Sequence, residues 1–442
     1  MSASLPPDAR RSLLVYNLLF PFALLFLLPG LLSRMFKRGN FQEKFSQRLG
    51  RFDSAARERF QQGRWIWIHS ISVGETLLAL KLARRMLELD PAISIALSVT
   101  TSTGFAVATR GKHERLEPIY NPLDFPPIVR RTLNVLHPER LVFIEAIWPN
   151  LLAICKQRGL PVGFIPRMSP RSERRFRRFR AWTGPLFRLI DTLAVGDDND
   201  IARWLPLDVR REQCQITGNI KYDQEATAPA NLEPLRAFLD EFGVGPDRPI
   251  LLAGSTFPGE ETIIANAMVK IRDKHPTLFA IIAPRHVERT PEIVRELESS
   301  PLRVALRTEP AKSPCDLLLL NTTGELRDWY HLCTLVFIGK SLTGRGGQNP
   351  VEPVLAGKPV LFGPHMQNFE PLASRWVESG AALRVHDANE LISRCHDLLS
   401  DARLRDVMAE RARRSIELHH GATTRTARAL LGMGEASKAT AL

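Results

Sequence analysis

The sequence is poor in cysteine, and its few cysteines are scattered along the chain. They are Cys155, Cys214, Cys315, Cys333 and Cys395. No CxxC pair and no cysteine–histidine cluster with zinc-ligand spacing occurs, so the sequence predicts neither a disulfide framework nor a structural metal site. A reducing compartment is the simplest interpretation of this cysteine usage.

The sequence has fewer acidic residues than basic ones. The chain has 442 residues with 60 Lys and Arg against 47 Asp and Glu, a net charge of +13. This excess favours phosphates, anionic lipids or nucleic acid as partners, without choosing among them. A hydrophobic share of 44% and an aromatic share of 7% are typical of globular proteins and exclude disorder, collagen and a coiled-coil rod. The length allows two large domains or about three smaller ones.

A long uncharged apolar run stands near the start of the chain, at residues 13–32. Twenty residues of helix span roughly 30 Å, the thickness of the hydrocarbon layer. Asn17, Pro21 and the Pro29-Gly30 pair interrupt the run, so both a membrane span and a shallow interfacial anchor stay open. No small-x-small cleavage site follows, and we therefore expect an uncleaved anchor rather than a signal peptide.

Positive charge is concentrated beside this run. Residues 1–64 hold eleven Lys or Arg and four Asp or Glu, and the basic residues after the run outnumber Arg10 and Arg11 before it. By the positive-inside rule the body of the protein is predicted on the cytoplasmic side of the membrane. Anionic lipids are the expected neighbours of this segment.

From residue 65 onward, short apolar runs alternate with helix-length segments, as in parallel sheets joined by crossover helices. The expected strands of a first sheet are 65–69, 93–99, 140–146, 160–165, 192–196 and 214–218. Those of a second sheet are 250–255, 278–284, 315–320, 335–339 and 359–363. The fold class is therefore α/β with two doubly wound domains, whose loops at the carboxyl ends of the strands should face an interdomain cleft.

The expected division of the chain has five parts. They are an anchor with its basic flank (1–40), a first domain (41–222), a linker (223–248), a second domain (249–432) and a tail (433–442). The polar helical segment 387–432 is interpreted as a solvated capping region of the second domain.

Two loops of the first domain carry candidate chemistry. In His69-Ser-Ile-Ser-Val-Gly-Glu75, Glu75 opens a helix, where it can complement the helix dipole while Gly74 permits a tight turn. Alternatively Glu75 is a general base, although the dipole alone would lower its pKa. In the loop 100–104, hydroxyls and a glycine can cap a helix or turn amides toward an anion.

The segment 171–180 holds six arginines and two phenylalanines. It is typical of an amphipathic helix with a basic face, and nucleic acid is an alternative ligand. No nucleic-acid-binding motif accompanies it. With a membrane anchor in the same chain, phospholipid or a phosphorylated glycolipid is the favoured anion.

The second domain offers three candidate loops. Ser255 and Thr256 end a strand, Arg285 and His286 end the next, and residues 344–353 follow a third. In the last loop, Asn349, Pro350 and Glu352 can be a simple helix cap. Its adjacent glycines could instead bring backbone amides to a nucleotide phosphate.

Taken in order, these loops resemble those of the 3-deoxy-D-manno-octulosonic acid (Kdo) transferases. The matching segments are HSISVGE (69–75), TTSTG (100–104), WPNLL (148–152), GNIKYD (218–223), AGSTFPGEE (253–261), APRHVER (283–289), TTGEL (322–326) with WY (329–330), GGQNPVEP (346–353) and GKPVLFGPHMQNF (357–369). The resemblance implies a GT-B fold and inverting transfer of Kdo from CMP-Kdo to a lipid A precursor at the cell inner membrane. It implies neither a metal nor a cofactor, and no nucleic acid partner.

The resemblance also assigns roles to residues. It implies that Glu75 is the general base that deprotonates the acceptor hydroxyl. Donor-binding residues are Ser255, Thr256, Arg285, His286, Gly324, Glu325, Ser341, Gly346, Gly347, Asn349 and Glu352. Acceptor-binding residues are Ser72, Gly74, Arg167 and Ser169.

The chain departs from the family pattern at several points. Ile144-Glu145-Ala146-Ile147 replaces a segment with paired acidic residues, and Arg167 follows Ile165-Pro166 where Asn-Ala-Arg is usual. Gln348 replaces a histidine, and Lys340 stands where a second glycine is expected. A divergent acceptor or a different number of transferred Kdo residues is a hypothesis that follows. A related GT-B transferase with another donor or acceptor, and a catalytically silent protein binding anionic lipid or nucleic acid, are the alternatives.

Overall fold

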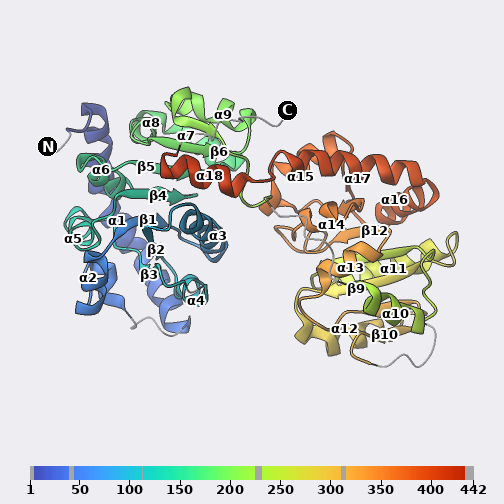
Figure 1. Ribbon diagram of the computed structural model, residues 1–442. Helices are drawn as coiled ribbons and strands as arrows, with labels where there is room; N and C mark the ends of the chain where they lie inside the picture. The colour runs from blue at the N-terminus through green and yellow to red at the C-terminus, as the bar shows by residue number, and fades with distance from the viewer. Residues whose placement is uncertain (1–3, 39–43, 112, 224–230, 310–314, 434–442) are drawn as a thin grey trace, which may run out of the picture. The chain divides into compact units, whose positions relative to one another are not determined.

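The computed structural model describes residues 4–38, 44–111, 113–223, 231–309 and 315–433, with the side chains of 27–38 and of residue 170 excepted. It divides into two compact units, residues 1–223 with 419–442 and residues 224–418. Figure 1 shows both as layered α/β structures. Part of the expected linker, 224–230, and nearly all of the expected tail lie outside the described residues.

Unit 1 is built on a seven-stranded parallel sheet with the order β3-β2-β1-β4-β5-β6-β7. Its strands are β1 (Arg64–His69), β2 (Ile93–Val99), β3 (Leu116–Tyr120), β4 (Arg140–Ile144), β5 (Val162–Ile165), β6 (Thr192–Val195) and β7 (Cys214–Ile216). Its helices are α1 (Pro7–Arg38), α2 (Ser54–Gln61), α3 (Val73–Leu89), α4 (Ser102–Arg110), α5 (Pro126–Leu136), α6 (Pro149–Gln157), α7 (Pro170–Arg178), α8 (Arg180–Phe187), α9 (Asp198–Trp204) and α18 (Ala422–Leu431).

Unit 2 repeats this plan with a parallel sheet in the order β10-β11-β9-β8-β12-β13-β14. Its strands are β8 (Ile250–Thr256), β9 (Phe279–Pro284), β10 (Val304–Leu306), β11 (Leu317–Leu319), β12 (Leu335–Ile338), β13 (Val360–Phe362) and β14 (Leu383–Arg384). Its helices are α10 (Glu233–Glu241), α11 (Glu260–Arg272), α12 (Thr290–Leu297), α13 (Leu326–Leu332), α14 (Val351–Leu355), α15 (Leu372–Glu378), α16 (Ala388–Ser400) and α17 (Ala402–Glu417). Short 3-10 helices are η1 (Phe45–Leu49), η2 (Leu205–Leu207), η3 (Arg211–Gln213), η4 (Val287–Arg289) and η5 (Gln367–Phe369).

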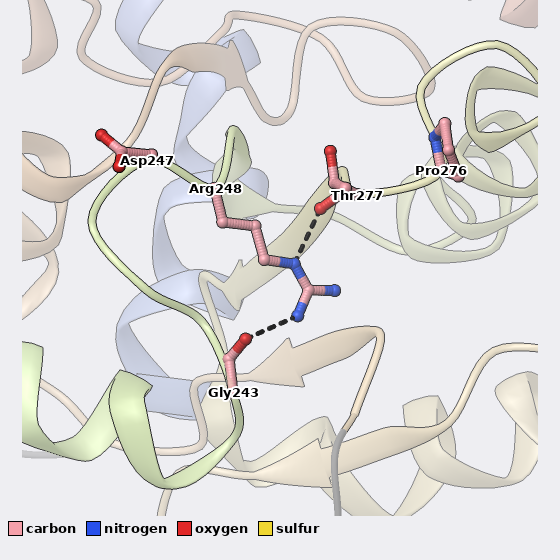
Figure 2. Close-up of a pocket in the computed structure, with 5 residues that line it drawn as sticks. All are labelled: Gly243, Asp247, Arg248, Pro276 and Thr277. Atoms are coloured by element: carbon pink, nitrogen blue, oxygen red, sulfur yellow. Dashed lines mark hydrogen bonds between the residues drawn. The ribbon is translucent and has the colours of Figure 1, made fainter.

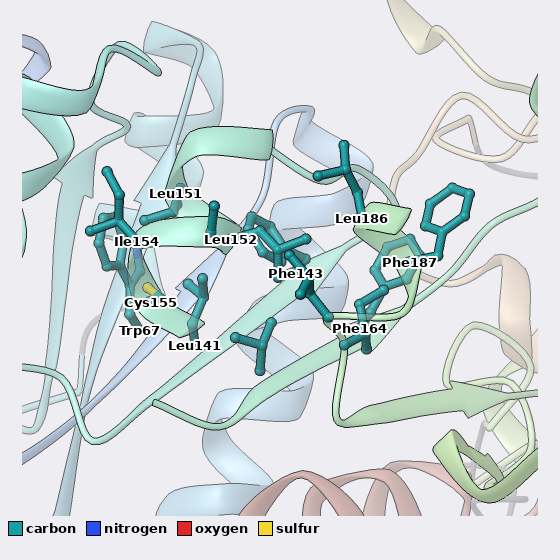
Figure 3. Close-up of a cluster of buried hydrophobic side chains, with 14 of the residues drawn as sticks. Trp67, Leu141, Phe143, Leu151, Leu152, Ile154, Cys155, Phe164, Leu186 and Phe187 are labelled. Atoms are coloured by element: carbon teal, nitrogen blue, oxygen red, sulfur yellow. The ribbon is translucent and has the colours of Figure 1, made fainter. Parts of the chain in front are cut away.

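Each sheet is buried on both faces, which explains why its strands are nearly continuous apolar runs. Along β1, Trp67 belongs to one core, while Ile66 and Ile68 belong to the core on the opposite face. Figure 3 shows the first of these cores, where Trp67 and Phe143 of the sheet lie among side chains from α6 and α8. All five cysteines are buried and unpaired in these interiors.

All eleven expected strands are present, and three others were not expected. β3 contains Pro118 and is an edge strand, the position where a missing N–H is tolerated. β10 and β14 are the opposite edges of the second sheet and have three and two residues, too few to give a pattern.

The domain boundaries differ from those expected at both points where the chain passes from one unit to the other. Residues 233–241 of the expected linker form α10, which packs in unit 2 through buried Leu235 and Leu239. Helix α18, expected in the second domain, belongs to unit 1, where Ala427 and Leu430 join the core of β1 and α3. The carboxylate of Asp223 accepts the N–H groups of Gly421 and Thr423 at 2.7 and 2.6 Å and fixes the start of this helix.

The expected solvated capping region 387–432 is therefore only partly solvated. α16 and α17 bury one side each, with Leu391, Leu398 and Met408 in the core of unit 2. Their charged residues lie on the opposite side, which is why the sequence suggested a solvated segment.

Candidate active site

Glu75 is held at the carboxyl edge of the first sheet by the start of α3. Ser72 is the N-cap of this helix, and its hydroxyl accepts the Glu75 N–H at 3.3 Å. The Glu75 carboxylate turns back and accepts the Ile71 N–H at 2.7 Å and the Ser72 hydroxyl at 3.0 Å. This reciprocal capping explains why the sequence places Ser three residues before Glu.

Burial decides the proton affinity of Glu75. It raises the pKa of the Glu75 carboxyl above its ordinary value, and the negative charge of Glu145 adds to the rise, while the Ile71 N–H opposes it. The sequence predicted a lowered pKa from the helix dipole alone. Desolvation outweighs the dipole here, and the shift has the sign that suits a general base.

A surface hollow of about 490 Å³ adjoins this helix start and is lined by Ser72, Val73, Thr101 and Thr103. Thr101 caps α4 by accepting the Gly104 N–H at 3.0 Å, as the sequence predicted. The loops after β1 and β2 thus meet around a common hollow.

Gly74 does not form the tight turn that the sequence suggested. It lies in the first turn of α3 rather than in a tight turn, its φ lies outside the left-handed region, and a Cβ there would meet nothing within 4 Å. Neither backbone conformation nor packing requires a glycine at this position.

Three further charged residues lie on the loops after β4, β5 and β7, and one of them, Glu145, acts on Glu75 through its charge. Glu145 follows β4 in a left-handed conformation, with φ of +59°, and pairs with Arg167 at 3.4 Å. Burial and the charge of Arg167 lower the pKa of Lys221 to about 8, and Glu145 opposes them. The sequence assigned a role to Arg167 but none to Lys221 or Glu145, although Lys221 stands in the GNIKYD segment.

Ser169, the other expected acceptor residue, is engaged in a helix cap. Its hydroxyl accepts the Ser172 N–H at 3.1 Å at the start of α7 and lies 3.0 Å from the Ser172 hydroxyl. Its hydroxyl therefore fixes the start of the arginine-rich helix α7.

In unit 2, the strand that ends at Ser255 and Thr256 carries one outward and one inward side chain. Ser255 is half-buried and left-handed, with φ of +57°, beside a bulge in the pairing with β9. Thr256 is buried, and its hydroxyl donates to Glu261 at 2.9 Å. Thr256 therefore stabilises the loop from within instead of presenting its hydroxyl to a ligand.

Glu260 organises the loop after β12 and was missed from the sequence. This fully buried carboxylate accepts backbone N–H groups from Lys340 at 2.7 Å, from Ser341 and Leu342 at 2.9 Å each, and from Phe257 at 2.9 Å. A fourth loop amide, that of Thr343, lies 3.4 Å away. The only sequence signal was an acidic pair at the helix start, which is also typical of a simple cap.

The glycine loop is likewise satisfied internally. The Gly346 N–H donates to the Gln367 side chain at 2.9 Å, and the Gly347 N–H donates to the Lys340 carbonyl at 3.0 Å. Both glycines have positive φ, and a Cβ on them would lie 2.5 and 2.3 Å from Asn368 and Met366. They allow the close approach of residues 365–368, so their amides do not form the free phosphate cradle that the sequence suggested.

Ser341, Asn349 and Glu352 are also tied to their neighbours. The buried Ser341 hydroxyl donates to the Ile338 carbonyl and accepts the Gly363 N–H at 2.7 Å. The Asn349 side chain accepts the Val351 N–H at 3.0 Å and donates to Glu352 at 3.0 Å. α14 begins one residue later than predicted, with Pro350 as its N-cap, because Asn349 forms a local turn ahead of the helix.

Side-chain cations remain available at this edge of the second sheet. Among the described residues, no hydrogen bond or ion pair involves the exposed guanidinium groups of Arg285 and Arg345. His286 lies 3.3 Å from Glu288, and Glu325 accepts from Arg307 at 3.3 Å beside Gly324, whose φ is +95°. Arginine guanidinium groups bind phosphate strongly, so these two arginines, more than the loop amides, can hold one.

The hollow drawn in Figure 2 lies at the opposite edge of the second sheet. Its lining residues, Gly243, Asp247, Arg248, Pro276 and Thr277, precede β8 and β9. The Arg248 guanidinium donates to the carbonyls of Thr277 and Gly243 at 2.7 and 3.2 Å and closes this edge. The described residues contain no group of three His, Cys, Asp or Glu side chains with metal-site geometry.

Comparison with known proteins identifies the family. A family model described as 3-deoxy-D-manno-octulosonic-acid transferase matches residues 43–224. The 3-deoxy-D-manno-octulosonic acid transferase of Bordetella pertussis is 32% identical over 382 residues, which cover 83% of this chain and 86% of that protein. The Haemophilus influenzae transferase is 30% identical, over 85% of this chain and 87% of its own length. The chain belongs to the Kdo transferase family. It is therefore a glycosyltransferase.

Solved structures support the fold of this Kdo transferase. A glycosyltransferase from Rickettsia africae has a TM-score of 0.54 at 11% identity, over 86% of this chain and all of that one. Anabaena HepE in complex with UDP has a TM-score of 0.53 at 14% identity, over 84% of this chain and 99% of that one. The two α/β units have the GT-B architecture that the sequence predicted.

Proposed function

We propose that this family member transfers Kdo from CMP-Kdo to a phosphorylated glycolipid of the lipid A precursor type, with inversion and with Glu75 as general base. The observation that carries the proposal is Glu75 itself: a carboxylate with a raised pKa, fixed by two hydrogen bonds next to an open hollow. A base needs a pKa near the working pH and a position next to its substrate.

The proposed reaction is a single displacement. The acceptor hydroxyl oxygen attacks the anomeric carbon of Kdo, the bond from that carbon to the CMP phosphate breaks, and CMP leaves with the bonding electron pair. Glu75 takes the hydroxyl proton. One displacement inverts the anomeric centre and needs no covalent intermediate on the enzyme.

In this proposal unit 2 binds the donor. The phosphate of CMP is held by Arg285 and Arg345, whose charge compensates the negative charge that grows on the leaving group. Hydrogen bonds from the backbone of the loop 340–349 to the Glu260 carboxylate fix the loop before the donor binds. We also propose that the reaction needs no metal ion, because cationic side chains can supply the positive charge that a metal would.

Unit 1 binds the acceptor. Gly74 follows Val73, which lines the hollow, and its lack of a side chain lets a sugar approach the backbone of α3 closely. Arg167 and Lys221 interact with Glu145, whose charge acts on the base, and these two cations match an acceptor that carries phosphate. We also propose that the enzyme works at the cytoplasmic face of the inner membrane, because the basic residues that flank its apolar segment are attracted to anionic lipids.

The experiment is to incubate the purified full-length protein with CMP-Kdo and a tetraacyl lipid A precursor in EDTA. Release of CMP and the mass of the lipid product are followed together, and the mass counts the sugars added. We expect product formation in EDTA, and loss of it in Glu75→Gln. CMP release without a lipid product would contradict the acceptor, and full turnover by the variant would contradict the base.

A further inference from the structure

Helix α1 begins inside the hydrophobic core of unit 1. Leu5, just before the helix, and Ala9 in its first turns are buried in the cluster that contains Trp67 and Phe143. Asp8 pairs with Arg188 at the end of α8, and α1 packs along α8 and α6. The start of the apolar segment is thus part of the folded body.

The middle of α1 is also docked on this body. The side-chain amides of Asn17 and Asn150 exchange hydrogen bonds at 3.1 and 2.7 Å. The Phe20 ring packs edge-on against Phe125 and Trp148, at centroid distances of 5.2 and 6.3 Å. Asn150 is buried and Asn17 is exposed, so separating the pair would leave the buried Asn150 amide without this partner, at a cost in free energy.

The other side of the same helix is apolar and open. Its large side chains are 59–86% exposed, and they are Leu14, Leu18, Leu19, Phe22, Leu25 and Phe26. Their spacing places them on one side of a helix with 3.6 residues per turn. A contiguous exposed apolar stripe of this size marks a surface that contacts something apolar.

A basic, aromatic surface adjoins the first half of α1. Helix α7 exposes Arg171, Arg174, Arg175 and Arg178, and none of them has a carboxylate partner among the described residues. Phe179 and Trp182, between α7 and the middle of α8, are 49% and 46% exposed. Figure 1 shows α7, α8 and the start of α1 at the same end of unit 1. Aromatic rings and arginines are the side chains that sit at the headgroup level of a bilayer.

Described residues on either side of α1 are attached to unit 1. Leu5 is in the core at one end, and beyond the other end Lys44 pairs with Glu117 while the Gln47 side chain accepts the Tyr120 N–H. A helix with this attachment cannot place its first residues across a bilayer from the body without breaking the Asn17–Asn150 pair and uncovering the core.

We infer that α1 lies along the membrane surface as an interfacial helix. Its stripe from Leu14 to Phe26 enters the boundary between headgroups and acyl chains, and the arginines of α7 contact the phosphates of anionic lipids. The partner is an anionic bilayer, and residues 7–26, although apolar enough to span one by length and composition, do not cross it. This inference is independent of the sugar-transfer chemistry.

Topology is tested with one reporter cysteine in the full-length chain. All five native cysteines are buried, so a membrane-impermeant maleimide reports on Ser4→Cys, with Ser299→Cys on the surface of unit 2 as the same-side reference. In sealed vesicles, both variants should react before permeabilisation. Labelling of Ser4→Cys only after permeabilisation, with Ser299→Cys labelled before it, would show a span and overturn the inference.

The surface is tested by vesicle flotation of the full-length protein. Leu18→Glu/Phe22→Glu should reduce binding at least tenfold to vesicles with 30% phosphatidylglycerol, without lowering Tm because both side chains are exposed. Changing the four arginines of α7 that lack a carboxylate partner to Gln should weaken binding to these vesicles and remove its dependence on anionic lipid. Leu404→Glu, 41% exposed in unit 2, is the matched control and should bind normally. Unchanged binding by the stripe variant would refute the proposed surface.

Discussion

The two units use the same edge of the same kind of sheet in different ways. In unit 1, the loops after β1, β4 and β5 leave Glu75, Glu145 and Arg167 partly accessible, and an open hollow adjoins the start of α3. In unit 2, the loops after β8 and β12 are tied together by buried Glu260 and Ser341. Changes at the first edge should therefore alter chemistry with little loss of stability, whereas changes at the second should alter structure.

The largest effect on activity is expected for Glu75→Gln. Removal of a general base slows the chemical step by about 10² to 10⁴-fold, so kcat for Kdo transfer should fall by that factor. The glutamine keeps the shape of the side chain, and Tm and CMP binding should be unchanged. Glu88→Gln, at an exposed position on the same helix, is the control and should retain full activity. A normal kcat in Glu75→Gln would show that Glu75 of unit 1 is not the base of the reaction.

The largest effect on stability is expected for Glu260→Gln in unit 2. The amide has one acceptor oxygen where the carboxylate accepts from the amides of Phe257, Lys340, Ser341 and Leu342. Each buried donor left unpaired costs about 1–3 kcal/mol, so the free energy of unfolding should fall by about 3 kcal/mol. Denaturant titration measures it, and calorimetry should show weaker CMP binding.

Glu292→Gln is the matched control, because Glu292 is exposed on α12 and pairs only with Arg289 at the surface among the described residues. It should leave both the unfolding free energy and CMP binding unchanged. If Glu260→Gln behaved like this control, the donor loop would not depend on the buried carboxylate.

A smaller effect, on binding alone, is expected for Arg285→Ala. Hydrogen bonds to charged groups contribute about 1.5–3 kcal/mol, which corresponds to roughly a 10- to 100-fold weaker interaction with CMP-Kdo. We expect a higher KM for the donor with stability unchanged, since Arg285 is exposed. Arg295→Ala on α12 should not affect KM. An unchanged donor KM in Arg285→Ala would show that other residues of unit 2 bind the phosphate.

The strands and the order of the loops could be predicted from the sequence, because buried parallel strands are continuous apolar runs bounded by glycine and proline. Edge strands such as β3 and β14 could not, since they are short or contain proline. The return of α18 to unit 1 depends on Asp223, nearly 200 residues away in sequence, and no local pattern reports such a contact.

Within the site, residue types were easier to predict than their environments. Glu75 stands out because it opens a helix after a strand, but the sign of its pKa shift depends on burial and on Glu145, which only the folded loops bring together. Glu260 was missed for the reverse reason. Its sequence context is that of an ordinary first-turn acid, and four of its five amide partners follow β12, about 80 residues away in the sequence.

The pH dependence of unit 1 should respond to Glu145→Gln. The negative charge of Glu145 raises the pKa of Glu75, so its removal should lower that pKa. Because the base acts when deprotonated, the acid limb of the kcat profile should move to lower pH. Asp198→Asn, far along the chain at the start of α9, serves as the control and should leave the limb in place. A shift to higher pH would mean that Glu145 acts on Glu75 through a hydrogen bond or a structural change rather than through its charge.

The smallest expected effect concerns backbone strain in unit 2. Lys340 has φ of +56°, a conformation that costs about 1–2 kcal/mol for a residue with a Cβ, while its ammonium gains a contact 5.0 Å above the Phe257 ring. Lys340→Gly relieves the strain and loses this contact, whereas Lys340→Ala loses the contact and keeps the strain. The glycine variant should therefore be more stable than the alanine variant by about 1 kcal/mol, measured as the difference in unfolding free energy. Equal stabilities would show that the loop moves to relieve the strain at the alanine. The hydrogen bonds from Glu260 would then hold this loop less rigidly than the comparison of the two units implies.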